Sequence, residues 1–251
     1  MTTQAAPRMA AWRRWRIAER PVSPTFMLLM ACAWMATAGN AALWKQLSAL
    51  GVLSGAPGWL LAAGLAGFVM GMLTLLGALL GWRWTLKPFL ILLLVVSAGS
   101  THFSLSFGTI MDPSMMTNVL QTDAGESADL LSATMLLHLA LLAGLPIVWI
   151  VTQPVVHGTP SKAVRRNAKL VLGGFLVAIL SVLVCFQPLA STMRNHKQVR
   201  YLINPLNVVY SLGSVLFSGP ARSGQVQPIG QDAVIAKRFE GLRPPLLVLV
   251  A

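Results

Sequence analysis

Three polar side chains recur at intervals of four residues in one loop of the sequence: Asn118, Thr122 and Glu126. On a helix that continues through Gly125, this spacing rotates only about 40° per step, so the three side chains would form one polar stripe. An amide, a hydroxyl and a carboxylate that face the same way can bind a zwitterionic headgroup, with the carboxylate opposite an ammonium. These three are therefore the candidate substrate-binding residues.

Glu126 also has a structural interpretation. Asp123 and Glu126 have the spacing of a capping box, which would start the next helix along the chain. Considered without other information, these residues favour the cap over the binding role. One carboxylate can serve both roles, so the two interpretations stay open at this point.

Other residues that carry chemistry lie inside or near apolar runs. His102 and His138 are two isolated histidines, a weak metal signal, and we interpret them as core or interface residues. Asn40 is interpreted as an interhelical hydrogen-bonding residue. Cys32 and Cys185 are too few for a disulfide framework or a zinc site, so they are expected in the core. The sequence thus predicts neither catalytic nor metal-ligating residues.

The loop that carries the polar stripe spans residues 108–129 and holds four of the seven acidic residues of the chain. Within it, Asp112 followed by Pro113 is typical of a helix start, with Asp as the N-cap and Pro at the first helical position. The helix would have an apolar side formed by Met115, Met116, Val119 and Leu120. A short amphipathic helix of this kind is suited to the interface between lipid and water.

The elements that must position this loop are long apolar runs. A bilayer core about 30 Å thick needs roughly 20 apolar residues of helix. Five stretches qualify, and none contains Asp, Glu, Lys or Arg: Pro24–Trp44, Pro57–Gly81, Pro88–Phe107, Leu130–Val151 and Leu170–Leu189. Lipid offers the backbone no hydrogen-bond partner, so each must be helical. The predicted fold class is an all-α membrane protein, with five transmembrane helices in residues 24–189.

Composition supports this class and argues against two others. The chain of 251 residues is 55% hydrophobic and 10% charged, whereas a soluble domain carries about 25% charged residues. A formal charge of +12 would suit nucleic acid, but the basic residues lie between apolar runs and not on a stripe with interleaved aromatics. We therefore expect membrane lipids as partners, and no nucleic acid.

The distribution of Lys and Arg predicts which ends of the spans face the cytoplasm. Basic residues gather before the first span and in the second-to-third and fourth-to-fifth loops, at Arg8, Arg13, Arg14, Arg16, Arg20, Arg83, Lys87, Lys162, Arg165, Arg166 and Lys169. Of the alternate loops, one holds only Lys45 and the other holds no basic residue. Residues 1–23 are therefore predicted to be a cytoplasmic N-terminus, and the C-terminus is predicted on the far side of the membrane.

The residues after the fifth span form two further segments. Residues 190–218 are predicted to be an amphipathic helix on the outer surface, because Arg194, Lys197 and Arg200 are interspersed with apolar residues. Residues 219–251 are predicted to be a linker followed by a short apolar strand. A single strand with nothing to pair against is not a stable ending, so we expect the chain to stop at the entrance to another domain.

Three segments resemble the bacterial phosphoethanolamine transferases, which modify lipid A or the lipopolysaccharide core and include the colistin-resistance enzymes. The first is Met111-Asp112-Pro113 through Asn118-Val119-Leu120-Gln121-Thr122-Asp123, with Glu126 and Leu130. The second, Arg194-Asn195-His196-Lys197 through Arg200 with Ile203-Asn204-Pro205, resembles the bridging helix of this family. The third, Pro244–Ala251, resembles the first strand of its sulfatase-like periplasmic catalytic domain. The resemblance covers essentially the whole chain.

The resemblance implies transfer of phosphoethanolamine from phosphatidylethanolamine to lipid A or a lipopolysaccharide core sugar, at the bacterial inner membrane with the C-terminus in the periplasm. In the family, a threonine nucleophile activated by zinc attacks the phosphodiester and forms a phospho-enzyme. The family's headgroup-contacting positions in the membrane domain match Asn118, Thr122 and Glu126. This match raises substrate binding above helix capping as the role of Glu126.

The sequence departs from the family where the catalytic domain should begin. The family's Gly-Glu-Thr-Ala-Arg metal-binding motif should follow the strand that ends near Ala251, and that motif, the later nucleophile and the zinc ligands are not in this sequence. We therefore expect an anchor, a platform for lipid substrate and a tether, without transferase activity in this chain alone. The alternatives are a freestanding transporter or channel, or the membrane anchor of another sulfatase-like transferase.

Overall fold

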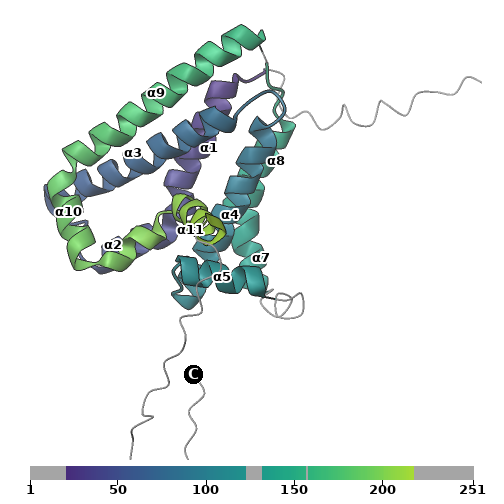
Figure 1. Cartoon of the computed structure of the whole chain (residues 1–251). Helices are drawn as coiled ribbons and strands as arrows, with labels where there is room; N and C mark the ends of the chain where they lie inside the picture. The colour runs from purple at the N-terminus through teal and green to yellow at the C-terminus, as the bar shows by residue number, and fades with distance from the viewer. Residues whose placement is uncertain (1–20, 123–131, 157, 218–251) are drawn as a thin grey trace, which may run out of the picture. The chain divides into compact units, whose positions relative to one another are not determined.

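A computed structural model describes residues 21–122, 132–156 and 158–217, and five of its helical segments are long and apolar enough to cross a membrane (Figure 1). The spans are Pro24–Ala49, Gly55–Leu80 (α3), Leu86–Phe107 (α4), Ala133–Thr152 and Pro160–Val184 (α9), in chain order. The predicted five-span, all-α membrane fold is therefore confirmed. The predicted linker and strand at 219–251 lie outside the described residues.

The first span is broken near its middle. It consists of α1 (Pro24–Ala36), the 3₁₀ turn η2 (Ala38–Asn40) and α2 (Ala41–Ala49). At this break the carbonyl oxygen of Gly39 accepts hydrogen bonds from the hydroxyl groups of Ser97 and Thr101 on α4, at 3.2 and 2.5 Å. Both hydroxyl groups are buried, so the break in the first span is fixed against the third span.

The fourth span also departs from regular α-helix. Its parts are α7 (Ala133–Leu139), the π-helical turn η3 (Ala140–Gly144) and α8 (Leu145–Thr152). Pro146 lies at the start of α8 and has no backbone N–H, so it cannot donate to the carbonyl four residues before it. The π-helical turn ends two residues before Pro146. A proline is a common cause of such a local departure from regular helix.

The second and fifth spans pack closely through small residues (Figure 1). A Cβ atom added to Gly71 on α3 would lie 2.6 Å from the carbonyl oxygen of Gly174 on α9, and one added to Gly174 would lie 2.6 Å from the Gly71 oxygen. In the same row, Gly67 faces the hydroxyl of Ser181. The small-residue face at Gly67 and Gly71 is therefore the contact surface between these two spans.

Gly77 on α3 and Gly81 at its C-cap have different roles. A Cβ atom on Gly77 would meet the Leu28 side chain of α1 at 2.4 Å. Gly81 is the C-cap of α3, and its carbonyl oxygen accepts a hydrogen bond from the Asn167 side-chain amide on α9 at 3.2 Å. Gly77 thus allows close packing against the first span, whereas Gly81 is part of a polar contact at the helix end.

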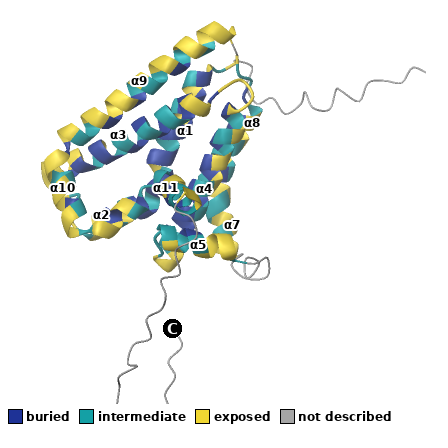
Figure 2. Cartoon of the chain, viewed as in Figure 1, coloured by how far each residue is buried: buried dark blue, intermediate teal, exposed yellow. Residues whose placement is uncertain are grey.

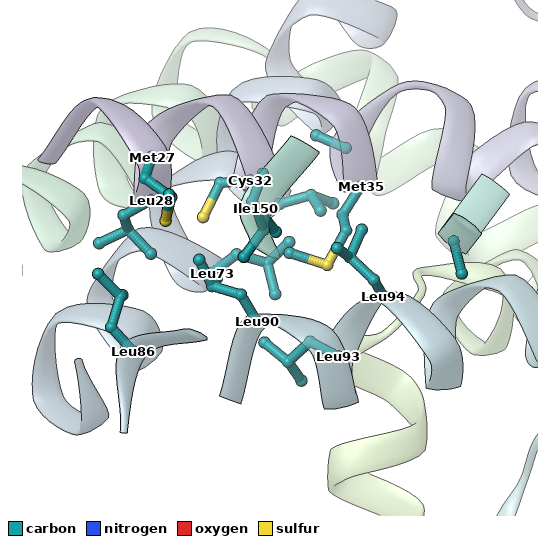
Figure 3. Close-up of a cluster of buried hydrophobic side chains, with 14 of the residues drawn as sticks. Met27, Leu28, Cys32, Met35, Leu73, Leu86, Leu90, Leu93, Leu94 and Ile150 are labelled. Atoms are coloured by element: carbon teal, nitrogen blue, oxygen red, sulfur yellow. The ribbon is translucent and has the colours of Figure 1, made fainter. Parts of the chain in front are cut away.

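The hydrophobic core lies between α1, α3, α4 and α8 (Figure 3). Its buried side chains include Met27, Leu28, Cys32, Met35, Leu73, Leu90, Leu94 and Ile150. Cys32 and Cys185 are both buried as free thiols, as the sequence predicts. The outer side of α9 has the opposite character (Figure 2), with exposed apolar residues such as Leu172, Phe175, Leu180 and Leu183. An apolar surface of this kind suits contact with lipid.

The fifth span begins at Pro160 instead of the predicted Leu170, and it ends at Val184 instead of Leu189. The prediction counted apolar residues only, and Lys162 and Arg165 interrupt that count. A helix can nevertheless continue into the headgroup region with basic side chains, because lysine and arginine are favoured there. The basic residues that the sequence places in the loop between the fourth and fifth spans therefore lie in the first turns of α9.

The segment after the fifth span consists of three pieces in place of one bridging helix over 190–218. They are α10 (Phe186–Asn195), the 3₁₀ helix η4 (Lys197–Leu202) and α11 (Leu206–Phe217). The break between η4 and α11 contains Pro205, which cannot continue a helical hydrogen-bond pattern. Val199 and Leu202 of η4 are buried against Leu43 and Leu47 of α2, so the segment packs on the end of the first span.

Candidate functional site

The helix α5 (Pro113–Gln121) begins as the sequence predicts. Oδ1 of Asp112 accepts hydrogen bonds from the Met115 backbone N–H at 2.8 Å and from the Ser114 hydroxyl at 2.7 Å, and Pro113 is the first helical residue. These two bonds, the Met115 N–H first, hold the pKa of the Asp112 carboxyl below its ordinary value, because they stabilise the charged form. Asp112 therefore acts as a charged N-cap.

The predicted polar stripe required one helix that continues through Gly125, and α5 ends before that residue. The helix α5 ends at Gln121, because Thr122 has an extended backbone. Both the backbone N–H and the hydroxyl of Thr122 donate to the carbonyl oxygen of Asn118, at 2.9 and 2.8 Å. Asn118 and Thr122 thus remain neighbours through a C-terminal cap. Glu126 lies outside the described residues.

The helix α5 has a buried side chain at Met116 and an exposed face near its end. Met116 is 6% exposed, whereas Val119 and Leu120 are 47% and 55% exposed. Asn118 is also exposed. The hydroxyl proton of Thr122 is used within the turn, but its oxygen lone pairs can still accept. The exposed end of α5 therefore offers amide and hydroxyl acceptors beside apolar side chains, a combination that suits a lipid headgroup with N–H donors.

The start of α5 is fixed to α11 through one carbonyl group. The oxygen of Met111 accepts hydrogen bonds from the Asn207 side-chain amide at 2.6 Å and from the Ser211 hydroxyl at 2.8 Å. Asn207 and Ser211 are buried, and the same amide donates to the Tyr201 carbonyl at 2.8 Å. Neither residue is among the candidates predicted from the sequence. Their i, i+4 spacing as polar residues in an apolar helix was the available signal.

A buried polar cluster connects the segment after the fifth span to the first and third spans. The Asn40 side chain donates to the Asn204 carbonyl at 2.6 Å, and the Asn204 backbone N–H donates back to Asn40 Oδ1 at 2.8 Å. Asn204 Oδ1 accepts from Ser100 at 2.8 Å, and its amide donates to Thr101 at 3.2 Å. Asn40 and Asn204 are both 0% exposed. The interhelical role predicted for Asn40 is confirmed, and Asn204 is its principal partner.

The two histidines meet between α4 and α7. Nδ1 of His102 lies 2.8 Å from Nδ1 of His138, so one nitrogen must carry the proton and the other must accept. His102 is 1% exposed, and its Nε2 has no partner within the described residues. A proton on that Nε2 would be a buried unpaired donor, so the favoured arrangement places the proton on Nδ1 of His102. The sequence did not indicate that these residues lie together.

This histidine pair does not fit zinc, the metal that the resemblance implies for the family. Within the three described ranges, no group of three or more His, Cys, Asp or Glu residues could hold a metal ion. Zinc sites in proteins have three or four protein ligands, whereas His102 and His138 supply two nitrogens. We therefore assign no zinc chemistry to these residues.

A cavity of about 330 Å³ lies at the same end of the helices as α5. Its lining includes Lys45 and Gln46 of α2, Ser104 of α4, Gln198 of η4 and Ile110. The Lys45 side chain is exposed and provides an ammonium group that can bind a phosphate oxygen. In the sequence, Lys45 contributed only to the prediction of orientation, because the lining residues from α4, η4 and the segment around Ile110 are distant from it in the chain.

Comparison with known proteins identifies one family and several relatives. The family model for phosphoethanolamine transferase EptA/EptB matches residues 69–218. Phosphatidylethanolamine transferase Mcr-2 of Escherichia coli is 30% identical over 244 residues, which is 96% of this chain and 44% of that protein. Phosphoethanolamine transferase EptA of Escherichia coli strain K12 is 25% identical over 222 residues, or 87% of this chain and 40% of that protein. The chain thus spans less than half the length of these relatives.

One solved structure has a similar fold. The integral membrane lipooligosaccharide phosphoethanolamine transferase A (EptA) from Neisseria meningitidis matches with a TM-score of 0.70 at 23% sequence identity. The match covers 78% of this chain and 36% of that chain. At this identity the similarity concerns the fold, and it supports the five-span architecture described above.

Proposed function

Because the chain belongs to the phosphoethanolamine transferase EptA/EptB family, we propose that it is the membrane domain of an enzyme that transfers phosphoethanolamine from phosphatidylethanolamine to lipid A or the lipopolysaccharide core. In this proposal the chain provides the anchor in the bacterial inner membrane and part of the binding site for the lipid substrate. The chemistry of the transfer itself is assigned to a periplasmic catalytic domain of the family type, with its zinc.

The binding role rests on one observation above the others: α5 carries an exposed Asn118 beside Thr122, and its start is fixed to α11 through the Met111 carbonyl. The ammonium of phosphatidylethanolamine has three N–H donors, which suit the carbonyl oxygen of Asn118, the hydroxyl oxygen of Thr122 and the carboxylate of Glu126. The Lys45 ammonium is the proposed partner of the lipid phosphate.

The proposed orientation places the N-terminus in the cytoplasm and the C-terminus in the periplasm. Its support is the position of the basic residues: Lys87 and Arg166 lie at one end of the spans, whereas α5 and its acidic cap Asp112 follow the other end of α4. Cytoplasmic ends are enriched in Lys and Arg. This orientation puts α5 and Lys45 on the periplasmic side, where the lipid acceptor would be modified.

A lipid-binding measurement tests the proposal with the chain itself. Purified chain in detergent is titrated with phosphatidylethanolamine and with phosphatidylcholine, and bound lipid is counted by native mass spectrometry. Phosphatidylcholine has the same charges but no N–H donors, so we expect preferential retention of phosphatidylethanolamine. Asn118→Ala and Glu126→Ala should reduce that preference, each by roughly tenfold for the loss of a hydrogen bond to a charged group.

The matched control is Gln121→Ala, an exposed amide on the same helix, which should leave the preference unchanged. Equal retention of the two lipids by the unmodified chain would refute the binding role. If Asn118→Ala and Glu126→Ala lower the amount of folded protein and leave the lipid preference intact, the two residues are structural and Glu126 is only a cap.

A chimera tests the assignment to the transferase. This chain replaces the matching 44% of Mcr-2 from Escherichia coli, and lipid A from cells that express the chimera is analysed by mass spectrometry. The mass increase of added phosphoethanolamine is the expected result. The Asn118→Ala chimera should show less modification at the same membrane level. An unmodified lipid A with normal membrane insertion would contradict the assignment.

The family match does not favour the alternatives. A transporter usually has charged residues or broken helices at mid-depth that line a pathway. In the described spans, the break at η2 accepts buried hydrogen bonds from α4, and η3 accepts a hydrogen bond from Trp34 of α1. An anchor for another sulfatase-like transferase would share the five spans, but the matching family is the phosphoethanolamine transferases.

A further inference from the structure

A second cavity lies at the opposite, basic end of the spans. Its volume is about 310 Å³, and its lining includes Arg83, Trp82 and Trp84 from the loop between α3 and α4, together with Pro24, Pro160 and Arg166. It adjoins the start of α4, whereas α5 follows the end of that helix, which at 22 residues is about 33 Å long. This cavity is therefore separate from the proposed binding site for the transferase substrate.

Arg166 is held in place at the edge of this cavity. Its Nε and Nη2 donate to Oδ1 of Asn167 at 3.0 and 2.8 Å, and Nη2 also donates to the Gly81 carbonyl at 3.5 Å. Among the described residues no hydrogen bond forms with Nη1, which retains two donors. A guanidinium that is already oriented loses little side-chain entropy when it binds an anion, and its planar fork matches phosphate oxygens.

The surroundings of the cavity are strongly positive. The first turns of α9 carry Lys162, Arg165, Arg166 and Lys169. In the residues that the structure describes, Asp112 is the one Asp or Glu, and it belongs to the opposite end of the spans. The potential at this end therefore favours an anion.

The two tryptophans locate the cavity at the level of lipid headgroups. Trp82 and Trp84 are 45% and 82% exposed, and tryptophan is enriched where the bilayer meets water. Arg83 lies over the Trp84 ring with its Cζ 5.6 Å from the centroid. An anion at the headgroup level of the membrane is part of a lipid. The acyl chains of such a lipid can lie along the exposed apolar surface of α9 (Figure 2).

We propose that this cavity binds the headgroup phosphate of an anionic phospholipid from the adjacent leaflet, with Arg166 as the principal contact and Arg83 as a second one. Basic pockets between transmembrane helices on the cytoplasmic side are typical sites for such headgroups. The site is distinct from lipid-substrate binding at α5. It would hold the start of α9 and the loop after α3 at a defined depth in the membrane.

Native mass spectrometry of the full chain in detergent tests the proposal, with phosphatidylglycerol as the anionic lipid and phosphatidylcholine as the zwitterionic reference. We expect phosphatidylglycerol to bind more tightly. Arg166→Gln should weaken phosphatidylglycerol binding by roughly tenfold, the effect of losing a charge-assisted hydrogen bond. Arg165→Gln changes the net charge equally at the neighbouring, exposed position outside the cavity, so it should weaken binding by less than roughly fivefold.

Two further measurements separate binding from folding and from free anions. Arg83→Gln removes the second cation without changing α9, and it should also weaken phosphatidylglycerol binding. This variant therefore tests the proposal even if Arg166→Gln proves unstable. Inorganic phosphate should not displace the lipid at concentrations comparable with that of the lipid. Equal losses in Arg165→Gln and Arg166→Gln, equal binding of the two lipids, or displacement by inorganic phosphate would each overturn the proposal. Failure here leaves the role of α5 untouched, because the two sites lie at opposite ends of the spans.

Discussion

The indole Nε1–H of Trp34, on α1, donates a hydrogen bond of 2.8 Å to the carbonyl oxygen of Leu142 in η3. Leu142 lies four residues before Pro146, whose nitrogen has no hydrogen to donate in the α-helical pattern. Inside a bilayer there is no water to replace that donor. The first span therefore supplies, from a side chain, a donor at the carbonyl that would bond to residue 146 in a regular α-helix.

Replacing Trp34 with phenylalanine should destabilise the protein, because it removes the donor and keeps an aromatic ring. We expect a loss of about 1 kcal/mol in the free energy of unfolding, in the range found for side-chain hydrogen bonds between membrane helices. Unfolding in mixed micelles with increasing denaturing detergent measures it. The control is Trp59→Phe, because Trp59 is 75% exposed on α3. Equal losses in the two variants would contradict the role of the bond to Leu142.

Asn40 and Asn204 should behave as one unit. The Asn40 side chain bonds to both the carbonyl oxygen and the N–H of the Asn204 backbone, and both residues are fully buried. Asn40→Ala leaves the Asn204 backbone N–H and carbonyl without this partner, so we expect a loss of about 1–3 kcal/mol. Asn204→Ala keeps the backbone groups that Asn40 binds, but it removes the side-chain bonds to Ser100 and Thr101 that hold this backbone in place. Because the two residues belong to one hydrogen-bond network, a double-mutant cycle should show that the double variant loses less than the sum of the single losses. Additive losses would mean that the two residues act independently.

The charged N-cap of α5 predicts a defined pH dependence. The pKa of the Asp112 carboxyl is lowered in the folded protein, so its contribution to stability is present above the unfolded value of about 3.9. That contribution is lost as the pH falls through the lower folded value. Amide hydrogen exchange of α5 should therefore be constant from neutral pH down to about pH 5, after correction for intrinsic rates, and should rise below about pH 4.

Two variants check that Asp112 causes this effect. Asn is as good an N-cap as Asp, so Asp112→Asn should keep α5 protected at neutral pH and remove its pH dependence below about pH 4. Asp112→Ala should lose about 1 kcal/mol of local stability at neutral pH. If Asp112→Asn retains the acid-induced loss of protection, a different group is responsible for it.

The sequence predicted the spans well because a bilayer requires long apolar helices, and a run such as Pro88–Phe107 satisfies that requirement locally. It predicted the start of α5 for a similar reason, since Asp112 and Pro113 form a local cap. It did not predict the contacts of Asn204, because its partners Asn40 and Ser100 are more than 100 residues away in the chain. The end of α5 at Gln121 was also not predicted, because nothing in the residue types around Thr122 indicates its extended backbone.

The packing of the second span on the fifth gives the last prediction. Gly71→Ala should destabilise the protein, because the new Cβ would lie 2.6 Å from the Gly174 carbonyl oxygen, a backbone atom that cannot move without shifting α9. Forced overpacking of this kind costs about 1–3 kcal/mol. The matched control is Gly173→Ala, because nothing lies within 4 Å of its added Cβ. Alanine is the better helix former, so Gly173→Ala should be neutral or should stabilise by up to about 1 kcal/mol.

The sign of the difference between Gly71→Ala and Gly173→Ala decides whether α3 and α9 are in close contact in the membrane. Helix propensity alone would make both substitutions favourable, so a loss in Gly71→Ala that Gly173→Ala does not share comes from the contact with the α9 backbone at Gly174 and Ala178. Gly174→Ala should reproduce that loss, since its Cβ would meet the Gly71 carbonyl oxygen at the same distance of 2.6 Å. If both Gly71→Ala and Gly174→Ala stabilise the protein as Gly173→Ala does, the two helices are separated by more than the structure indicates.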